Sequence, residues 1–94
     1  MIISFRNQAT RKLYEDGKIG PFRGLDMPLA FKRFALLNAI TTLNEVPALR
    51  SVHLHALKGS RQGQFAISVN AGWRICFEFN NGAARNVEVV DYHD

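Results

Sequence analysis

QFAISVNAGWRICFEF, residues 64–79, alternates apolar and polar side chains over most of its length and predicts two β-strands joined by a turn. Successive side chains of a strand point to opposite faces of a sheet, so the apolar residues at odd positions share one face. Residues 70–72 (Asn-Ala-Gly) suit a three-residue turn that pairs Val69 with Trp73. This register keeps the apolar residues of both strands together.

A second turn is expected near residues 81–82 (Asn-Gly), before a third strand. Asn-Gly is a strong signal for a two-residue hairpin turn, but that turn would pair Phe77 with Asn86 and put the apolar sets on opposite faces. A three-residue connection instead pairs Ile75 with Val89. We therefore expect the longer turn, with all odd positions of the sheet facing the core.

Two helices are expected before the strands. Asn7 is a favoured N-cap and Gly17 a favoured residue just past a helix end, so a first helix lies between them. Asp26 caps a second helix, in which Pro28 is tolerated in the first turn and whose latest end is set by Pro47. Apolar residues recur in it at near-helical spacing, at Phe34, Leu37, Ile40 and Leu43.

These elements predict an α+β fold in which two amino-terminal helices cover one face of a small antiparallel sheet. The first five residues are apolar and suit an additional strand. With 94 residues, 47% of them hydrophobic, residues 1–94 are expected to form one domain with a modest core. Lys32 and Arg33 fall on the outer face of the second helix, where charged side chains are usually solvated. The even-numbered face of the sheet is left for a partner.

The composition is basic. Twelve Lys and Arg against eight Asp and Glu give a net charge of +4, and the pI is about 9.7. This balance favours a polyanionic partner, nucleic acid first, although a basic protein kept soluble by its charge has the same composition. Cys76 is the only cysteine, which favours a reducing, cytoplasmic setting. No run approaches the roughly 18 apolar residues that cross a bilayer, so no membrane association is expected.

Two polar clusters flank the strands, at residues 55–61 (HALKGSR) and 91–93 (DYH). RNA cleavage without a metal needs a group that deprotonates the ribose 2′-hydroxyl, a group that protonates the leaving 5′-oxygen, and cations around the phosphate. The chain supplies candidates for each of these tasks: His55, His93 and Tyr92 for the proton transfers, and Lys58, Arg61 and Arg74 for the phosphate.

Each candidate also has a structural interpretation. The DYH cluster is compatible with a frayed tail, His55 with an ordinary surface histidine, and residues 58–59 (Lys-Gly) with a turn. Arg74 lies within a strand, where a cross-strand ion pair with Glu78 or Glu88 is a common alternative.

A metal site and a cysteine nucleophile are not expected. His53, His55, His93 and Cys76 are all metal-ligand types, but the chain has neither paired cysteines nor a His-Glu-x-x-His spacing. A lone cysteine in an apolar strand is usually inert packing, so Cys76 is not predicted to act as a nucleophile.

Three runs resemble the HigB branch of the RelE toxin superfamily, also called plasmid maintenance system killer proteins. They are residues 55–69 (HALKGSRQGQFAISV), residues 73–77 (WRICF) and residues 87–93 (VEVVDYH). The resemblance is strong over the last 40 residues, and the helical first half is compatible with it. Three departures are Phe65 where tryptophan is frequent, Ser60 where an acidic or amide residue is frequent, and the additional Asp94.

The resemblance implies a toxin that is a ribosome-dependent endoribonuclease, with a RelE-like fold and no cofactor. Such an enzyme cuts translated mRNA in the 30S decoding site, by 2′-hydroxyl attack that leaves a 2′,3′-cyclic phosphate. The resemblance also implies a HigA-like helix-turn-helix antitoxin, with operator DNA bound only through the complex of the two proteins.

The resemblance further implies roles for single residues. His55, Asp91, Tyr92 and His93 fall on active-site positions, and Lys58, Arg61 and Arg74 on basic positions. Arg74 and Lys58 are expected to stabilise phosphate, Tyr92 and His93 to handle protons, Asp91 to orient, and His55 to act as a secondary acid or base. A non-catalytic RNA-binding protein, or a regulatory subunit that acts with its antitoxin on DNA, is the alternative. The nuclease hypothesis requires the tail and Arg74 to meet at one place.

Overall fold

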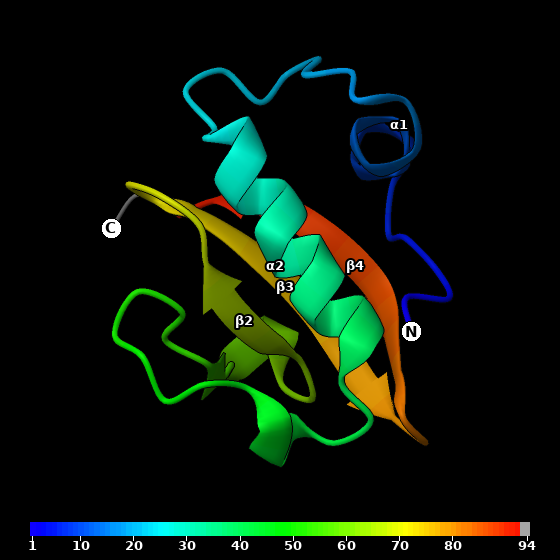
Figure 1. Ribbon diagram of the computed structural model, residues 1–94, viewed down its shortest axis with the longest axis vertical. Helices are drawn as coiled ribbons and strands as arrows, with labels where there is room; N and C mark the ends of the chain where they lie inside the picture. The colour runs from blue at the N-terminus through cyan, green and yellow to red at the C-terminus, as the bar shows by residue number, and fades with distance from the viewer. Residues whose placement is uncertain (93–94) are drawn as a thin grey trace.

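The computed structural model describes residues 1–92, which form two helices on one face of a four-stranded antiparallel sheet (Figure 1). The strands are β1 (His55–Ala56), β2 (Phe65–Ser68), β3 (Trp73–Asn80) and β4 (Ala83–Asp91), and they lie in that order across the sheet. The predicted α+β architecture is thus confirmed. None of the helices in this part of the chain has the length and apolar character needed to span a bilayer.

Helix α1 (Gln8–Asp16) begins and ends where the sequence predicts. The Asn7 side chain accepts a hydrogen bond from the Thr10 backbone N–H, and Gly17 closes the helix with a left-handed φ of 68°. Leu13 and Thr10 are fully buried, and the Thr10 hydroxyl accepts a hydrogen bond of 3.2 Å from the Val89 backbone N–H. This buried contact ties α1 to β4.

Helix α2 (Met27–Ala39) crosses the sheet (Figure 1). Asp26 caps it by accepting from the Leu29 backbone N–H. The helix ends at Ala39, well before Pro47, because the backbone of Ile40 turns to an extended conformation. Leu43, expected on its apolar face, lies instead in a short 3₁₀ helix, η1 (Leu43–Glu45).

The side chain of Arg33 differs from the solvated surface role expected of it. Its Nε donates to the Ser68 carbonyl at 2.8 Å, and its Nη2 donates to the Ser51 carbonyl at 3.2 Å. The guanidinium therefore joins α2 to β2 and to the loop at residues 46–54. Lys32 is exposed, as expected.

The first predicted register is confirmed. β2 and β3 pair Ile67 with Ile75, and beyond the strand ends the Val69 backbone N–H donates to the Trp73 carbonyl at 3.0 Å. Ile67, Ile75, Val69 and Trp73 are all buried in the core beneath α2.

The second turn is the two-residue Asn-Gly turn that the sequence argument rejected. Asn80 pairs with Ala83, and residues 81–82 both adopt positive φ, of 50° and 74°, as a primed hairpin turn requires. Ile75 nevertheless pairs with Val89 as predicted. A β-bulge reconciles the two, because the register shifts by one residue between Cys76 and Glu78.

The bulge changes which face each residue of β4 occupies. Asn86, at a left-handed φ of 51°, is part of the two-residue segment that lies opposite Phe77. Ala84, an even position before the bulge, is fully buried, and so is Val87 after it. The expectation that all odd positions of the sheet face the core is therefore wrong in β4 before the bulge. Ala66 and Cys76, both at even positions, are also buried, on the other face.

The amino-terminal segment lies along β4 but is not a regular strand. Ile2 and Phe5 form isolated parallel bridges to Ala84 and Val87, on either side of the bulge. Between them, the Ser4 hydroxyl accepts a hydrogen bond from the Asn86 backbone N–H at 2.8 Å. The bulge interrupts the ladder, so the predicted first strand is reduced to two bridges.

Substitution of Asn86 tests the bulge. Asn86→Gly retains access to the left-handed conformation and loses the 3.0 Å hydrogen bond from Asn86 to Glu78, so the free energy of unfolding should fall by about 1 kcal/mol. Asn86→Val places a β-branched residue at positive φ and should cost a further 1–3 kcal/mol or so. Urea denaturation measures both. Equal stability of the two variants would contradict this account of the bulge.

Candidate functional site

A pocket of about 230 Å³ lies where β1, β3 and the residue after β4 meet. It is lined by His53, His55, Leu57, Arg74 and Tyr92. Three residues predicted to be catalytic, from three separate parts of the sequence, thus line one pocket. His93, the third proton-transfer candidate, lies outside the described residues.

His55 is held by the backbone two residues before it. Its Nδ1 lies 2.8 Å from the His53 carbonyl oxygen. Because a carbonyl oxygen only accepts hydrogen bonds, Nδ1 carries the hydrogen, and Nε2 of the neutral ring has the lone pair. The ring can therefore take up a proton at Nε2 while its orientation stays fixed.

Arg74 is held by the turn between β2 and β3. Its Nη1 donates to the carbonyls of Ala71 and Trp73, at 3.0 and 3.1 Å. Both bonds come from Nη1, so within residues 1–92 the Nε and Nη2 donors remain for a phosphate. The alternative of a cross-strand ion pair is not supported, because Glu88 pairs with Arg6 and Arg61 instead.

Tyr92 is positioned by the same turn. Its backbone N–H donates to the Gly72 carbonyl at 2.8 Å, and its side chain is 39% exposed at the pocket. A Cβ atom on Gly72 would lie 2.6 Å from the Tyr92 carbonyl oxygen and 2.7 Å from Asp91 Oδ1. The tail can approach the turn this closely only because residue 72 is glycine.

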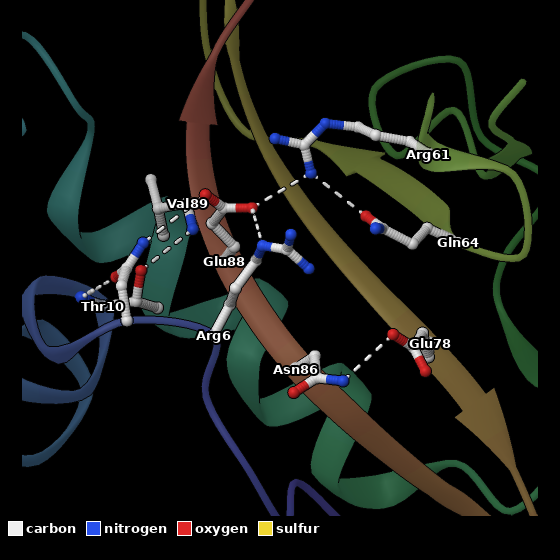
Figure 2. Close-up of polar contacts among 9 residues, drawn as sticks. Arg6, Thr10, Arg61, Gln64, Glu78, Asn86, Glu88 and Val89 are labelled. Atoms are coloured by element: carbon white, nitrogen blue, oxygen red, sulfur yellow. Dashed lines mark hydrogen bonds and ion pairs between the residues drawn. The ribbon is translucent and has the colours of Figure 1, made fainter. Parts of the chain in front are cut away.

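Arg61 and Lys58 do not line the pocket. Arg61 Nη1 donates to Glu88 Oε1 at 3.0 Å and to Gln64 Oε1 at 3.1 Å, and Arg6 Nε lies 3.6 Å from the same carboxylate oxygen (Figure 2). Burial tends to lower the pKa of Arg61, but the hydrogen bond and the charge of Glu88 outweigh it and raise this pKa. Lys58 is exposed and precedes the 3₁₀ turn η2 (Gly59–Arg61).

Cys76 lies on the same sheet face as the Glu88 network. It is fully buried, pairs with Ala66 and Glu88 on the neighbouring strands, and burial raises the pKa of its thiol. A protonated, inaccessible thiol is a poor nucleophile. Nor do residues 1–92 contain a group of three or more His, Cys, Asp or Glu side chains arranged to hold a metal ion.

His53 is a pocket residue that the sequence argument considered only as a metal ligand. Its ring centroid is 4.6 Å from that of His55, and its backbone has a left-handed φ of 47°. No sequence pattern indicates this placement, because His53 lies before β1 and its left-handed backbone departs from the alternation of an extended strand.

The fold is shared with the E. coli protein YafQ. A histidine-to-glutamine mutant of YafQ and YafQ from strain BL21(DE3) each match with a TM-score of 0.67, at 20% and 19% sequence identity. Each match covers 95% of this chain and 89% of the other. The chain therefore belongs to the class of small α+β domains that have the fold of YafQ.

The sequence comparisons identify the branch. The family model for HigB, a RelE-like toxin of type II toxin-antitoxin systems, matches residues 3–93. Endoribonuclease HigB of Proteus vulgaris is 39% identical over 95 residues, which cover 99% of this chain and all of that protein. The chain belongs to the HigB-like family of toxins, as its resemblance predicted, and this membership implies an antitoxin partner.

The contact between Gly72 and the tail is open to test. Gly72→Ala should lower the free energy of unfolding by about 1–3 kcal/mol, the usual cost of overpacking, because the new methyl group overlaps the Tyr92 carbonyl. Urea denaturation measures this cost. Gly72 does not have a left-handed φ, so backbone strain does not contribute. An unchanged denaturation midpoint would show that the tail is not held against the turn.

Proposed function

We propose that this chain is an mRNA endoribonuclease that stops translation, acting as a single toxin domain with no cofactor. The observation that carries the proposal is the convergence of His55, Arg74 and Tyr92 on one pocket. Family membership and the name of the 39% identical relative, Endoribonuclease HigB, support the same activity. The chemistry follows from the groups that line the pocket.

The proposed reaction is an internal transesterification of RNA. A base removes the proton of the ribose 2′-hydroxyl, the 2′-oxygen forms a bond to the adjacent phosphorus, and the bond from phosphorus to the 5′-oxygen breaks. An acid protonates that oxygen as it leaves. The products are a 2′,3′-cyclic phosphate and a 5′-hydroxyl end, and no group is oxidised or reduced.

The proposed roles follow from the position of each group. Arg74 donates hydrogen bonds to the phosphate, and these bonds become stronger as negative charge develops on the phosphate oxygens. Tyr92 and His93 form the proton-handling pair, and His55 exchanges a proton through Nε2. Asp91, whose carboxylate lies beside Gly72, orients the tail.

The two remaining cations act farther along the RNA. Lys58 is exposed close to His55 in the sequence and is suited to a phosphate contact. Arg61 is held at its Nη1 by Glu88, so we propose that it contributes positive potential and contacts RNA through its other nitrogens.

The finer setting is taken from the family resemblance. We propose that the substrate is mRNA on the ribosome, in the 30S decoding site, and that the protein acts in the cytoplasm. A HigA-like helix-turn-helix antitoxin would restrain it, and operator DNA would be bound only through that complex. A non-catalytic RNA-binding role is less well supported, because it does not require His55, Arg74 and Tyr92 to lie together in one pocket.

Expression from an inducible promoter tests the proposal. The intact chain should arrest growth and leave mRNA fragments with 5′-hydroxyl ends. His55→Asn keeps an N–H donor near the His53 carbonyl and removes Nε2, so cleavage should fall by about 10²–10⁴-fold. Arg74→Gln should lower it by about 10²–10³-fold. Primer extension on a reporter mRNA measures both effects.

His93→Ala tests the tail residue outside the described part of the chain, with a loss of cleavage expected as for His55. Lys12→Gln removes one exposed positive charge from α1, a helix that does not line the pocket, and the variant should cleave like the unaltered chain. Thermal unfolding must first show that every variant is folded. Full toxicity of the His55, Arg74 and His93 variants would refute the site.

A further inference from the structure

A second hollow, of about 430 Å³, adjoins the pocket described above. It is formed by the loop at residues 46–54, with Pro47, Leu49, Arg50, His53 and Leu54 among its lining residues. His53 lines both hollows. The two therefore meet at His53.

His53 is held at this junction in a conformation that costs energy. Its φ of 47° is uncommon for a residue with a side chain. The backbone N–H of His53 donates to the Leu49 carbonyl at 2.9 Å, and its carbonyl accepts from His55. Strained residues persist where their neighbours fix them, and they are frequent at functional sites.

The loop itself is tied to the sheet on the side away from the hollow. The Ser68 backbone N–H donates to the Val52 carbonyl at 2.7 Å, and Arg33 donates to the Ser51 carbonyl. Val52 is buried, whereas Leu49 is 58% exposed. The loop that forms the hollow is thus anchored to the sheet through Ser51 and Val52, which are not among the residues that line the hollow.

The lining suits a flat ring attached to a phosphate. Pro47, Leu49 and Leu54 provide apolar contact, His53 provides an aromatic face, and Arg50 provides a positive charge. Single-stranded RNA is recognised by stacking of splayed bases on histidine rings and arginine planes. A nucleotide next to the scissile phosphate would extend from the first pocket in this direction.

The geometry points to the loop hollow as a subsite for the base of a nucleotide that flanks the scissile phosphate, with His53 as the residue against which the base stacks. This inference rests on the proposed ribonuclease function, because the RNA strand is what connects the two hollows. The proposed subsite adds a substrate contact, made by His53 and Leu49, to the residues that carry out the cleavage reaction.

The test removes the protein group and the base in turn. His53→Asn suits the left-handed backbone, which asparagine tolerates, and keeps the carbonyl that holds His55. The substrates are ribosomes programmed with an mRNA that carries a single abasic nucleotide at each position flanking the cut. Cleavage rates of the intact chain and the variant on intact and abasic mRNA form a double-mutant cycle.

The intact chain should cut about tenfold more slowly when one particular flanking base is missing, in line with the loss of one stacked base. His53→Asn and Leu49→Ala should be about tenfold slower on intact mRNA and should lose no further rate with the abasic mRNA. Lys12→Gln should behave like the intact chain. Independent, additive losses would overturn the subsite, as would full activity of the intact chain on every abasic mRNA.

Two other outcomes separate this inference from the function on which it rests. If the intact chain cuts no mRNA, the ribonuclease function fails and the subsite fails with it. If the intact chain cuts mRNA and the His53 and Leu49 variants cut equally well but escape a co-expressed antitoxin, the hollow binds protein and the nucleotide subsite is wrong.

Discussion

β4 contains one more residue than β3, the strand with which it pairs. This additional residue allows the two strands to satisfy two pairing requirements that an uninterrupted ladder could not satisfy together. The Asn-Gly turn requires Asn80 to lie opposite Ala83, whereas the core requires Ile75 to lie opposite Val89. The bulge at Asn86 satisfies both. It also sets the spacing of the amino-terminal bridges and the position at which β4 delivers Tyr92 to the pocket.

Much of the fold could be predicted from the sequence because its signals are local. The caps Asn7, Gly17 and Asp26 fix the helix ends through hydrogen bonds and φ values of neighbouring residues, and all three were placed correctly. The second turn was wrong for a physical reason. The Asn-Gly turn and the alternation of apolar residues require different registers there, and a β-bulge satisfies both at the cost of one residue, Asn86, at positive φ.

Candidate site residues could be named from the sequence, but their arrangement in space could not be predicted from it. The sequence named His55, Arg74 and Tyr92 as candidates, and the structure brings these three to one pocket. The pairing of β3 with β4 explains why Arg74 and Tyr92 lie there together. Nothing local could reveal that Glu88 engages Arg61, because the two residues are 27 apart in sequence. The contribution of His53 depends on a left-handed backbone and on a loop anchored by Arg33, and neither has a sequence pattern of its own.

Contacts between residues that are far apart in the sequence also determine when the pocket forms during folding. Ile2 bridges Ala84, Phe5 bridges Val87, and Tyr92 is held by Gly72, so the contacts that complete the sheet span most of residues 1–92. Contacts of this range close late in folding, because a long loop must lose its freedom first. In a nascent chain that still lacks residues 83–92, neither these bridges nor the contact of Tyr92 with Gly72 exists, so the pocket is completed only after those residues have been synthesised.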